Sequence, residues 1–299
     1  DGRNVRTILR LMEEKKAEGK PFFLAAGFHK PHLPWTAPRA FFDLYPPGTL
    51  QPKPEPALRE VPAIALQTEL SGFAPPESRE EAIRGYYACV SFTDSHVGML
   101  LDQLDRLDLW KDTVVVLLSD NGFHLGDHGG LWAKLSAFDA ATRVPLILAG
   151  AGVPEGRVVR TPVELLDVFP TLAELCGAPA PDGLEGLSLV GLMRGPPAME
   201  KRRPAGSMVF HYDQAARTDV LGRTVIFEDG RYTEWESGRR GRELYVRAED
   251  PGEYHNRIAD PRVENAVRAG ETMLRQLPPP KPGPSNRPRA LLPAGEKSK

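Results

Sequence analysis

Asp120 and Asn121 open a segment whose residue types could bind a metal ion and an anion. They follow the apolar run 113–118. A carboxylate oxygen beside an amide oxygen suits a hard cation such as Ca²⁺ or Mg²⁺ better than zinc. Farther along, Lys134 could hold an anion as a compact point charge. Asp-Asn-Gly is also ordinary turn chemistry, and a calcium shell takes about six to eight oxygens. The segment can therefore supply at most half of a metal site.

His124 and His128 lie in the same segment, four and eight residues after Asp120. That spacing could also serve a zinc site, since imidazole nitrogens are common zinc ligands. Histidines that brace a loop are the more frequent case, and we interpret both as bracing residues.

A second group, His29, Lys30 and His32, follows the apolar run 21–28 and is stiffened by prolines. A positioned histidine can protonate a leaving group, and a lysine can neutralise an oxyanion. Both apolar runs are short and continuous, as in strands buried on both faces of a parallel sheet. The carboxyl ends of parallel strands meet at one edge, where ligand sites gather. We therefore expect the two groups to lie close together.

The elements that would position these groups alternate between helix and strand. Apolar residues at three- and four-residue steps predict an amphipathic helix from the start of the chain and a long one over 79–107. Strands are expected over 113–118 and 144–150, with a further helix ending near Gly177. This rhythm predicts an α/β fold with a mostly parallel sheet flanked by helices.

Three regions are expected along the chain. Residues 1–196 read as part of an α/β domain. Residues 197–277 are rich in short alternating segments and predict a small antiparallel sheet with a terminal helix. The proline-rich, charged residues 278–299 predict a disordered tail.

The composition restricts the partners. Lys plus Arg number 38 and Asp plus Glu 40 among 299 residues, a formal net charge of -2, so nothing indicates a nucleic-acid partner. No apolar run approaches the roughly 20 residues of a membrane span. Cys89 and Cys176 are too few for a disulfide framework, and either free thiols or a single disulfide between them fits the sequence.

Several strings occur in order between about residues 21 and 256. They are PFFLAAGFHKPHLPW, SDNGFHLGDHGGLWAK, ELLDVFPTLAELCGAP and RYTEW followed by RELYV. Together they resemble the sulfatase family, and most closely its iduronate-2-sulfatase branch within the alkaline-phosphatase-like superfamily. The resemblance implies an alkaline-phosphatase-like fold and hydrolysis of sulfuric esters, with a sulfated sugar or glycosaminoglycan as substrate.

The resemblance also implies roles for the matching residues. Asp120 and Asn121 would be ligands of Ca²⁺, with Mg²⁺ as the alternative. His32 would contact the sulfate and protonate the leaving alkoxide, and Lys134 would bind the sulfate and the bridging oxygen. Asn121 stands where the iduronate-2-sulfatase branch has His, so the exact substrate stays open.

Lys30 and His29 would lie beside His32 as substrate-binding residues. The family's nucleophile is a formylglycine made from the Cys of a Cys-x-Pro-Ser-Arg motif, and neither Cys89 nor Cys176 lies in such a motif. The family's Asp-Asp metal pair is also missing. We therefore expect this chain to be the C-terminal portion of a sulfatase that is inactive by itself.

Two alternatives remain open. The first is a phosphate- or phosphonate-ester hydrolase of the same superfamily, and the second is a catalytically inert fragment. Enzymes of this family are usually exported to the periplasm, the lysosome or the exterior.

Overall fold

The computed structural model describes residues 1–50, 54–66, 78–195, 204–213 and 216–279. Nearly all of the expected tail, 278–299, lies outside the described residues, so its predicted disorder stays a prediction.

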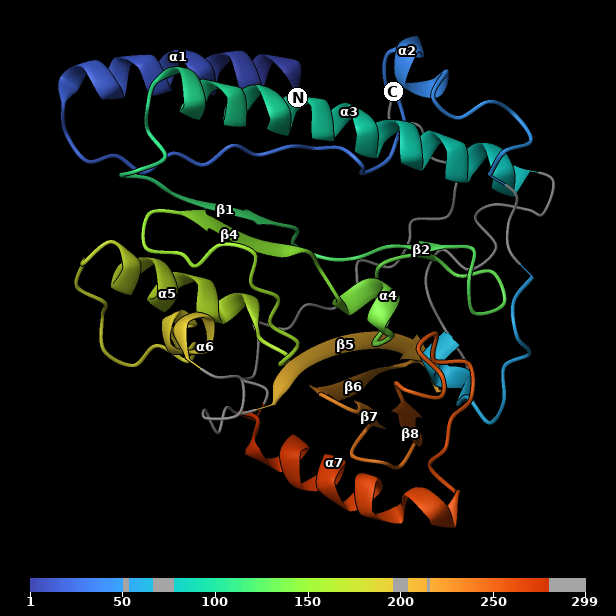
Figure 1. The fold of residues 1–299 in the computed structure, drawn as a ribbon. Coiled ribbons are helices and arrows are strands. Elements are labelled where there is room, and N and C mark those ends of the chain that lie inside the picture. The colour runs from blue at the N-terminus through green and yellow to red at the C-terminus, as the bar shows by residue number, and fades with distance from the viewer. Residues whose placement is uncertain (51–53, 67–77, 196–203, 214–215, 280–299) are drawn as a thin grey trace, which may run out of the picture.

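Two helices, α1 (Gly2–Glu18) and α3 (Arg79–Arg106), run alongside each other at the top of Figure 1. Their apolar stripes face one another, with Met12 and Leu104 buried in the contact. Both helices confirm the expectation from periodicity. The single turn α2 (Arg39–Phe42) lies in the proline-rich segment that follows His32 and packs against α3.

The apolar run 21–28, which the sequence predicts as a strand buried on both faces, is extended but unpaired among the described strands. Its side chains alternate. Phe22 and Leu24 pack toward α1 and α3, whereas Phe23 is 82% exposed. A strand needs a neighbour whose backbone completes its hydrogen bonds. Because no described strand supplies one, the expectation of a buried strand is wrong for this part of the structure.

The strands β1 (Val114–Leu118) and β4 (Leu146–Gly150) lie below these helices, and α5 (Val168–Leu175) and α6 (Val190–Arg194) lie on the other side (Figure 1). This layering confirms the α/β class. The sequence predicts a mostly parallel sheet, but β1 and β4 pair antiparallel. The intervening loop, which includes the single helical turn α4 (Asp139–Thr142), brings the chain back along β1 in the opposite direction.

That loop carries a short hairpin of β2 (His124–Leu125) and β3 (Trp132–Ala133). Single 3-10 turns, η1 (Ala63–Leu66) and η3 (Leu165–Asp167), occur in the connections before α3 and before α5.

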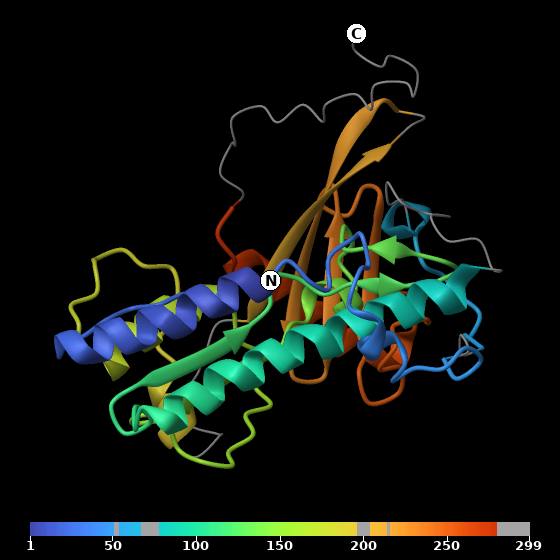
Figure 2. The ribbon, with the colours of Figure 1, turned by 90° about the horizontal axis from the view of Figure 1, so that it is seen from above.

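The C-terminal part is a four-stranded antiparallel sheet in sequence order, as predicted. Its strands are β5 (Ala205–Asp213), β6 (Thr218–Phe227), β7 (Gly230–Trp235) and β8 (Gly241–Val246). The turn η4 (Pro261–Val263) leads into α7 (Glu264–Gln276), which covers one face of the sheet. The β5–β6 hairpin extends beyond the rest of the sheet (Figure 2).

The other face of this sheet shares a hydrophobic core with the loop between β1 and β4. Val220, Trp235 and Tyr245 of the sheet pack with Leu131 and Phe138 of the loop. The two expected regions are therefore in direct contact, and the boundary placed between them at 196 and 197 stays a prediction.

Cys89 is buried and Cys176 is exposed, and both are free, so the structure holds no disulfide between them. Within the described part of the chain, no helix is long and apolar enough to cross a membrane.

Candidate active site

An aromatic cluster joins the segments that carry the predicted site residues. It consists of Trp35, Tyr86, Phe123 and Trp132. The ring centroid of Trp35 lies 6.1 Å from that of Phe123 and 6.0 Å from that of Trp132, and Tyr86 stacks on Phe123 at 5.7 Å. Ring pairs at such separations contribute roughly 0.5–1.5 kcal/mol each beyond the area that they bury. Packing of side chains thus holds the three segments together.

Three of the four rings stand close in the chain to a predicted residue, and the fourth, Tyr86, belongs to α3. Trp35 follows His32 by three positions, Phe123 follows Asp120 by three, and Trp132 precedes Lys134 by two. The two groups expected to meet are therefore carried by neighbouring segments, although the predicted shared edge of a parallel sheet is not what brings them together. The chemical roles of the individual residues stay predictions.

The loop that carries the first group is fixed through its backbone. The N–H groups of His29 and Lys30 donate to the carboxylate of Asp1 at 2.8 and 3.0 Å. Thr93 Oγ1 on α3 donates to the carbonyl of Lys30 at 3.2 Å. The Lys30 ammonium donates to the carbonyl of Pro34, so it points back into its own loop.

His32 is exposed, and one of its ring nitrogens is hydrogen-bonded within the loop. Its Nδ1 lies 2.8 Å from the carbonyl oxygen of Leu33. A carbonyl oxygen only accepts hydrogen bonds, so Nδ1 must carry the proton of this pair. The other nitrogen, Nε2, is then the one available to exchange a proton with a ligand. The ring of His29 lies 5.0 Å away, centroid to centroid.

The Asp120–Asn121 turn is fixed by the residue that follows it. The N–H of Gly122 donates to the carbonyl of Ala141 at 2.8 Å. A Cβ at Gly122 would lie 2.1 Å from the carbonyl oxygen of Ala140, so the backbone approaches α4 too closely for any other residue. Asp120 is exposed and Asn121 is half-buried at the end of β1. Their oxygens are hard donors of the kind that Ca²⁺ and Mg²⁺ prefer.

Lys134 follows β3 in a turn whose backbone is hydrogen-bonded both within the loop and to the C-terminal sheet. The N–H of Ser136 donates to the carbonyl of Lys134 at 3.0 Å. The next carbonyl, that of Leu135, lies 2.7 Å from Nε2 of His211 in β5. Lys134 itself is half-buried. Its position thus depends on contacts from its own loop and from the C-terminal sheet.

His124 and His128 share the carboxylate of Asp127. Nδ1 of His128 lies 2.7 Å from Oδ1 of Asp127, and Nδ1 of His124 contacts the same oxygen. Nε2 of His124 lies 2.7 Å from Oγ of Ser136, and Nε2 of His128 lies 3.2 Å from the carbonyl oxygen of Glu253. Burial raises the pKa of Asp127, but the hydrogen bonds from the two histidines outweigh it and hold that pKa well below its usual range.

The donor atoms of His124, Asp127 and His128 lie within 4.8 Å of one another, a spacing that could hold a metal ion. Each ring nitrogen nevertheless already has a protein partner, and His128 is packed between the rings of Phe138 and Tyr254. The contacts therefore favour the bracing interpretation of both histidines.

A buried charge network continues from this cluster into the C-terminal sheet. Arg231 Nε donates to Oε1 of Glu253 at 2.8 Å, and Arg231 Nη1 donates to Oγ1 of Thr233 at 2.5 Å. Its Nη2 lies 3.8 Å from Oε2 of Glu243. The guanidinium and both carboxylates are almost completely buried. Burial raises the pKa of Glu253, and Arg231 only partly offsets that effect.

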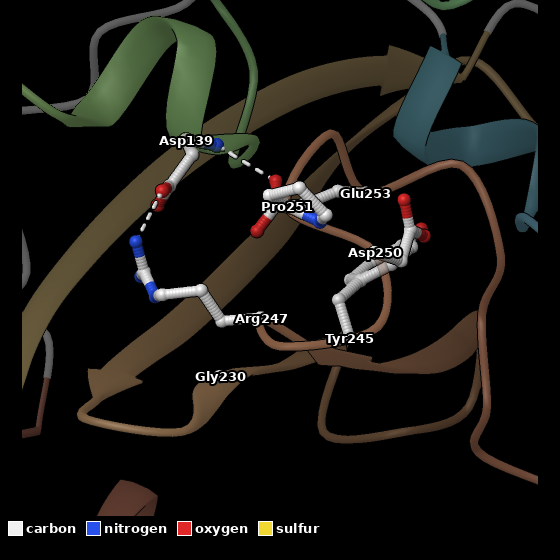
Figure 3. Close-up of a pocket in the computed structure, with 7 residues that line it drawn as sticks. All are labelled: Asp139, Gly230, Tyr245, Arg247, Asp250, Pro251 and Glu253. Atoms are coloured by element: carbon white, nitrogen blue, oxygen red, sulfur yellow. Dashed lines mark hydrogen bonds and ion pairs between the residues drawn. The ribbon is translucent and has the colours of Figure 1, made fainter.

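Glu253 also ties the sheet to the loop, as Figure 3 shows. Its Oε2 accepts from the backbone N–H of Asp139 at 2.8 Å, and Arg247 pairs with the Asp139 carboxylate at 3.0 Å. These residues line a small pocket that contains none of the predicted site residues. The charged groups drawn around Asp139 are paired within the protein, so we assign this region to bracing rather than to catalysis.

Sequence reasoning missed His211, Arg231 and Glu253. Arg231 carried a usable signal, because alternation along a strand places it on the same face of β7 as Thr233 and Trp235. Glu253 carried none, since it sits in an irregular segment with a positive φ of 63°.

Two family models match the chain. The sulfatase model matches residues 3–178, and a model of the C-terminal region of N-sulphoglucosamine sulphohydrolase matches residues 126–278.

Two curated proteins show the extent of the similarity. A sulfatase from Formosa agariphila is 33% identical over 265 residues, which cover 85% of this chain and 50% of that protein. Iduronate 2-sulfatase from Mus musculus is 34% identical over 223 residues, which cover 60% of this chain and 40% of that protein. The chain spans about half the length of the curated relatives that it matches.

Among solved structures, the phosphonate monoester hydrolase of Agrobacterium radiobacter has a TM-score of 0.72 at 21% identity, covering 90% of this chain and 58% of that one. At this identity the likeness concerns the fold alone, and it confirms the expected fold class.

Proposed function

The chain belongs to the sulfatase family, and from this premise we propose that it supplies part of the active site of a sulfuric ester hydrolase. The substrate class is a sulfated sugar or glycosaminoglycan, in keeping with the iduronate 2-sulfatase to which the chain is similar. The observation that carries the proposal is the aromatic cluster, because it gathers the segments of His32, Asp120 and Lys134 into one place.

In this proposal His32 is the general acid. Its Nδ1 is occupied by the carbonyl of Leu33, so the proton for the leaving alkoxide comes from Nε2. Lys134 binds the sulfate and stabilises the charge that develops on the bridging oxygen. Lys30 and His29 are proposed as substrate-binding neighbours, although the Lys30 ammonium must leave the carbonyl of Pro34 to reach a ligand.

Asp120 and Asn121 are proposed as ligands of Ca²⁺, with Mg²⁺ as the alternative. Their oxygens fit a hard cation, and an exposed carboxylate beside a half-buried amide leaves them accessible to one. The cation would polarise the sulfate oxygens. Two residues fill only part of a shell of about six to eight oxygens, so the remaining ligands come from elsewhere in the protein.

The nucleophile is likewise proposed to lie outside these residues, as a formylglycine. Cys89 is buried within α3, and Cys176 stands at the end of α5, on the other side of β1 and β4 from α1 and α3.

The runner-up function is phosphate- or phosphonate-ester hydrolysis, because a phosphonate monoester hydrolase shares the fold. The test compares turnover of aryl sulfate, aryl phosphate and aryl phosphonate by the complete protein that contains this chain. We expect the sulfate to be hydrolysed fastest and the isolated 299-residue chain to hydrolyse none of them. Faster phosphate or phosphonate turnover contradicts the sulfatase assignment.

The leaving group tests the role of His32. Replacing it with Asn should lower turnover of an alkyl sulfate by about 10²–10⁴. Turnover of nitrophenyl sulfate should fall far less, because that leaving group needs no proton. Lys134→Met should impair both substrates, and Lys111→Met is the matched control, since Lys111 is exposed and paired with Asp108. Equal losses on both substrates in the His32 variant would exclude the general-acid role.

A further inference from the structure

His211 is a buried histidine whose two ring nitrogens both face backbone carbonyl groups. It lies in β5 with 3% of its surface exposed. Its Nδ1 is 2.6 Å from the carbonyl oxygen of Ile64 in η1, and its Nε2 is 2.7 Å from the carbonyl oxygen of Leu135. A carbonyl oxygen only accepts, so a hydrogen bond at either contact is donated by the ring.

The ring of His211 is fixed on its face as well as at its nitrogens. The indole of Trp235 lies against it, with ring centroids 4.7 Å apart, and Trp235 Nε1 donates to Oε1 of Glu243 at 2.6 Å. A buried carbonyl oxygen without a donor is unfavourable, so the ring nitrogen that faces Leu135 is the group that satisfies its carbonyl.

The charged groups near the ring have other partners or belong to the contacted loop. On the strand of His211 itself, Asp213 is paired with Arg240 from the turn after β7. Glu243 lies behind the indole, and Lys134 belongs to the loop that His211 contacts. The other neighbours in this core, from η1 and β6, are apolar. The two carbonyl groups are thus the direct partners of the ring.

The contact with Leu135 bears on the proposed site, because Leu135 directly follows Lys134. On the far side of the same turn, Ser136 donates its N–H to the Lys134 carbonyl and its Oγ contacts His124. Two buried histidines therefore hold the turn. His124 belongs to the same loop, whereas His211 is 76 residues away from Leu135 and belongs to the C-terminal sheet.

We propose that His211 is a positioning residue that holds the Lys134 turn in place through the Leu135 carbonyl. The inference deepens the proposed function and rests on it for the role of Lys134. It assigns to the C-terminal sheet a part in the active site, since a sheet that contributes no predicted reactive residue fixes the orientation of the sulfate-binding lysine.

The first test needs no variant. In the complete protein labelled with ¹⁵N at histidine, we expect Nε2 of His211 to carry a slowly exchanging hydrogen, because that nitrogen donates to the Leu135 carbonyl. A nonprotonated Nε2 in His211 would overturn the inference, whatever the enzyme hydrolyses.

The second test uses His211→Phe, which keeps a flat ring against Trp235 and removes both ring nitrogens. Amide hydrogen exchange should quicken in residues 132–137 and in η1 and stay unchanged in α1 and α3. Tyr212→Phe is the matched control, because Tyr212 is the next residue on β5 and is partly exposed. Unchanged exchange in 132–137, or an equal increase throughout the protein, would overturn the proposal. If the variant does not fold, the ring-nitrogen measurement decides.

The third measurement is kinetic. In the complete protein, His211→Phe should lower kcat/KM for a sulfate ester by about tenfold to a hundredfold, the range expected for a displaced reactive group, while Tyr212→Phe leaves it unchanged. A complete protein that hydrolyses no sulfate ester refutes the proposed function, and the exchange and ring-nitrogen results still decide whether His211 holds the turn. An active enzyme that tolerates His211→Phe without loss refutes the inference alone.

Discussion

Replacing Arg231 with Met should destabilise the protein more than any change to a surface charge. Arg231 is 1% exposed and stands between two buried carboxylates, those of Glu253 and Glu243. Its guanidinium also lies over the ring of Tyr245, 4.8 Å from the centroid. Met keeps much of the volume but removes the charge and the donors.

The expected loss of stability follows from the buried carboxylates that the substitution leaves without a partner. Removing one partner of a buried ion pair leaves an uncompensated charge and typically reduces stability by about 3–5 kcal/mol. The total stability of a folded domain is about 5–15 kcal/mol, so the variant should lose a large share of it. By contrast, Arg239 is exposed and pairs with Glu236 at the surface, and its replacement with Met should change stability by about 1 kcal/mol or less.

The loss should depend on pH in a defined direction. Burial already raises the pKa of Glu253, and removing Arg231 removes the attraction that opposes the rise. A carboxyl group whose pKa is higher in the folded state than in the unfolded state favours folding at low pH, and this contribution disappears as pH rises through the folded pKa. The deficit of the variant relative to the wild type should therefore be smaller at pH 5 than at pH 8.

Urea unfolding followed by tryptophan fluorescence measures these differences. The double variant with Glu253→Gln should recover part of the loss, because the stranded carboxylate is gone, with a coupling of about 0.5–3 kcal/mol. A loss below about 1 kcal/mol for Arg231→Met would refute the reasoning. So would equal losses at pH 5 and pH 8, because they would show that no buried carboxylate takes up a proton.

Three further predictions concern the loop and its aromatic cluster. Gly122→Ala should disrupt the turn, because the new Cβ would lie 2.1 Å from the Ala140 carbonyl oxygen. We expect the free energy of unfolding to fall by more than about 1 kcal/mol and amide exchange around Phe123 to become faster. Unchanged exchange would contradict the close approach. Trp35→Leu should leave the fold intact but loosen the contact between the two site loops, seen as slower ester hydrolysis by the complete protein without loss of its circular dichroism; retained activity would show that the cluster is dispensable. Asp127→Asn should destabilise by about 1–3 kcal/mol at neutral pH. Since the folded pKa of Asp127 is lowered, that difference should hold above about pH 4 and shrink as pH falls further, and a difference that grows in acid would contradict the assigned hydrogen bonds.

Local patterns in the sequence predicted most individual elements. The three- and four-residue spacing of apolar residues gave α1 and α3, and the β-branched run 113–118 gave β1 within one residue. These patterns depend only on near neighbours in the chain, because the period of side-chain direction is a property of the element itself. The motif strings were equally direct, and they led to the family to which the chain belongs.

Pairing was harder to predict than the elements. The run 21–28 has the composition of a buried strand, yet it is unpaired among the described strands and exposes Phe23. The composition of a segment indicates whether it will be buried. It does not indicate which backbone, if any, will complete the hydrogen bonds of a strand.

The sequence by itself determined the residue types of the candidate site: an acid and an amide after β1, a lysine after a glycine-rich turn, and a histidine in a proline-stiffened loop. Only the tertiary structure decided how they are held. Trp35 meets Phe123 and Trp132 across the fold, and His211 reaches the Leu135 carbonyl from another sheet. The reason is physical. Candidate reactive residues can be recognised from the chemistry of their side chains alone. Their positions depend on contacts between residues far apart in the chain, and these contacts form only when the whole chain has folded.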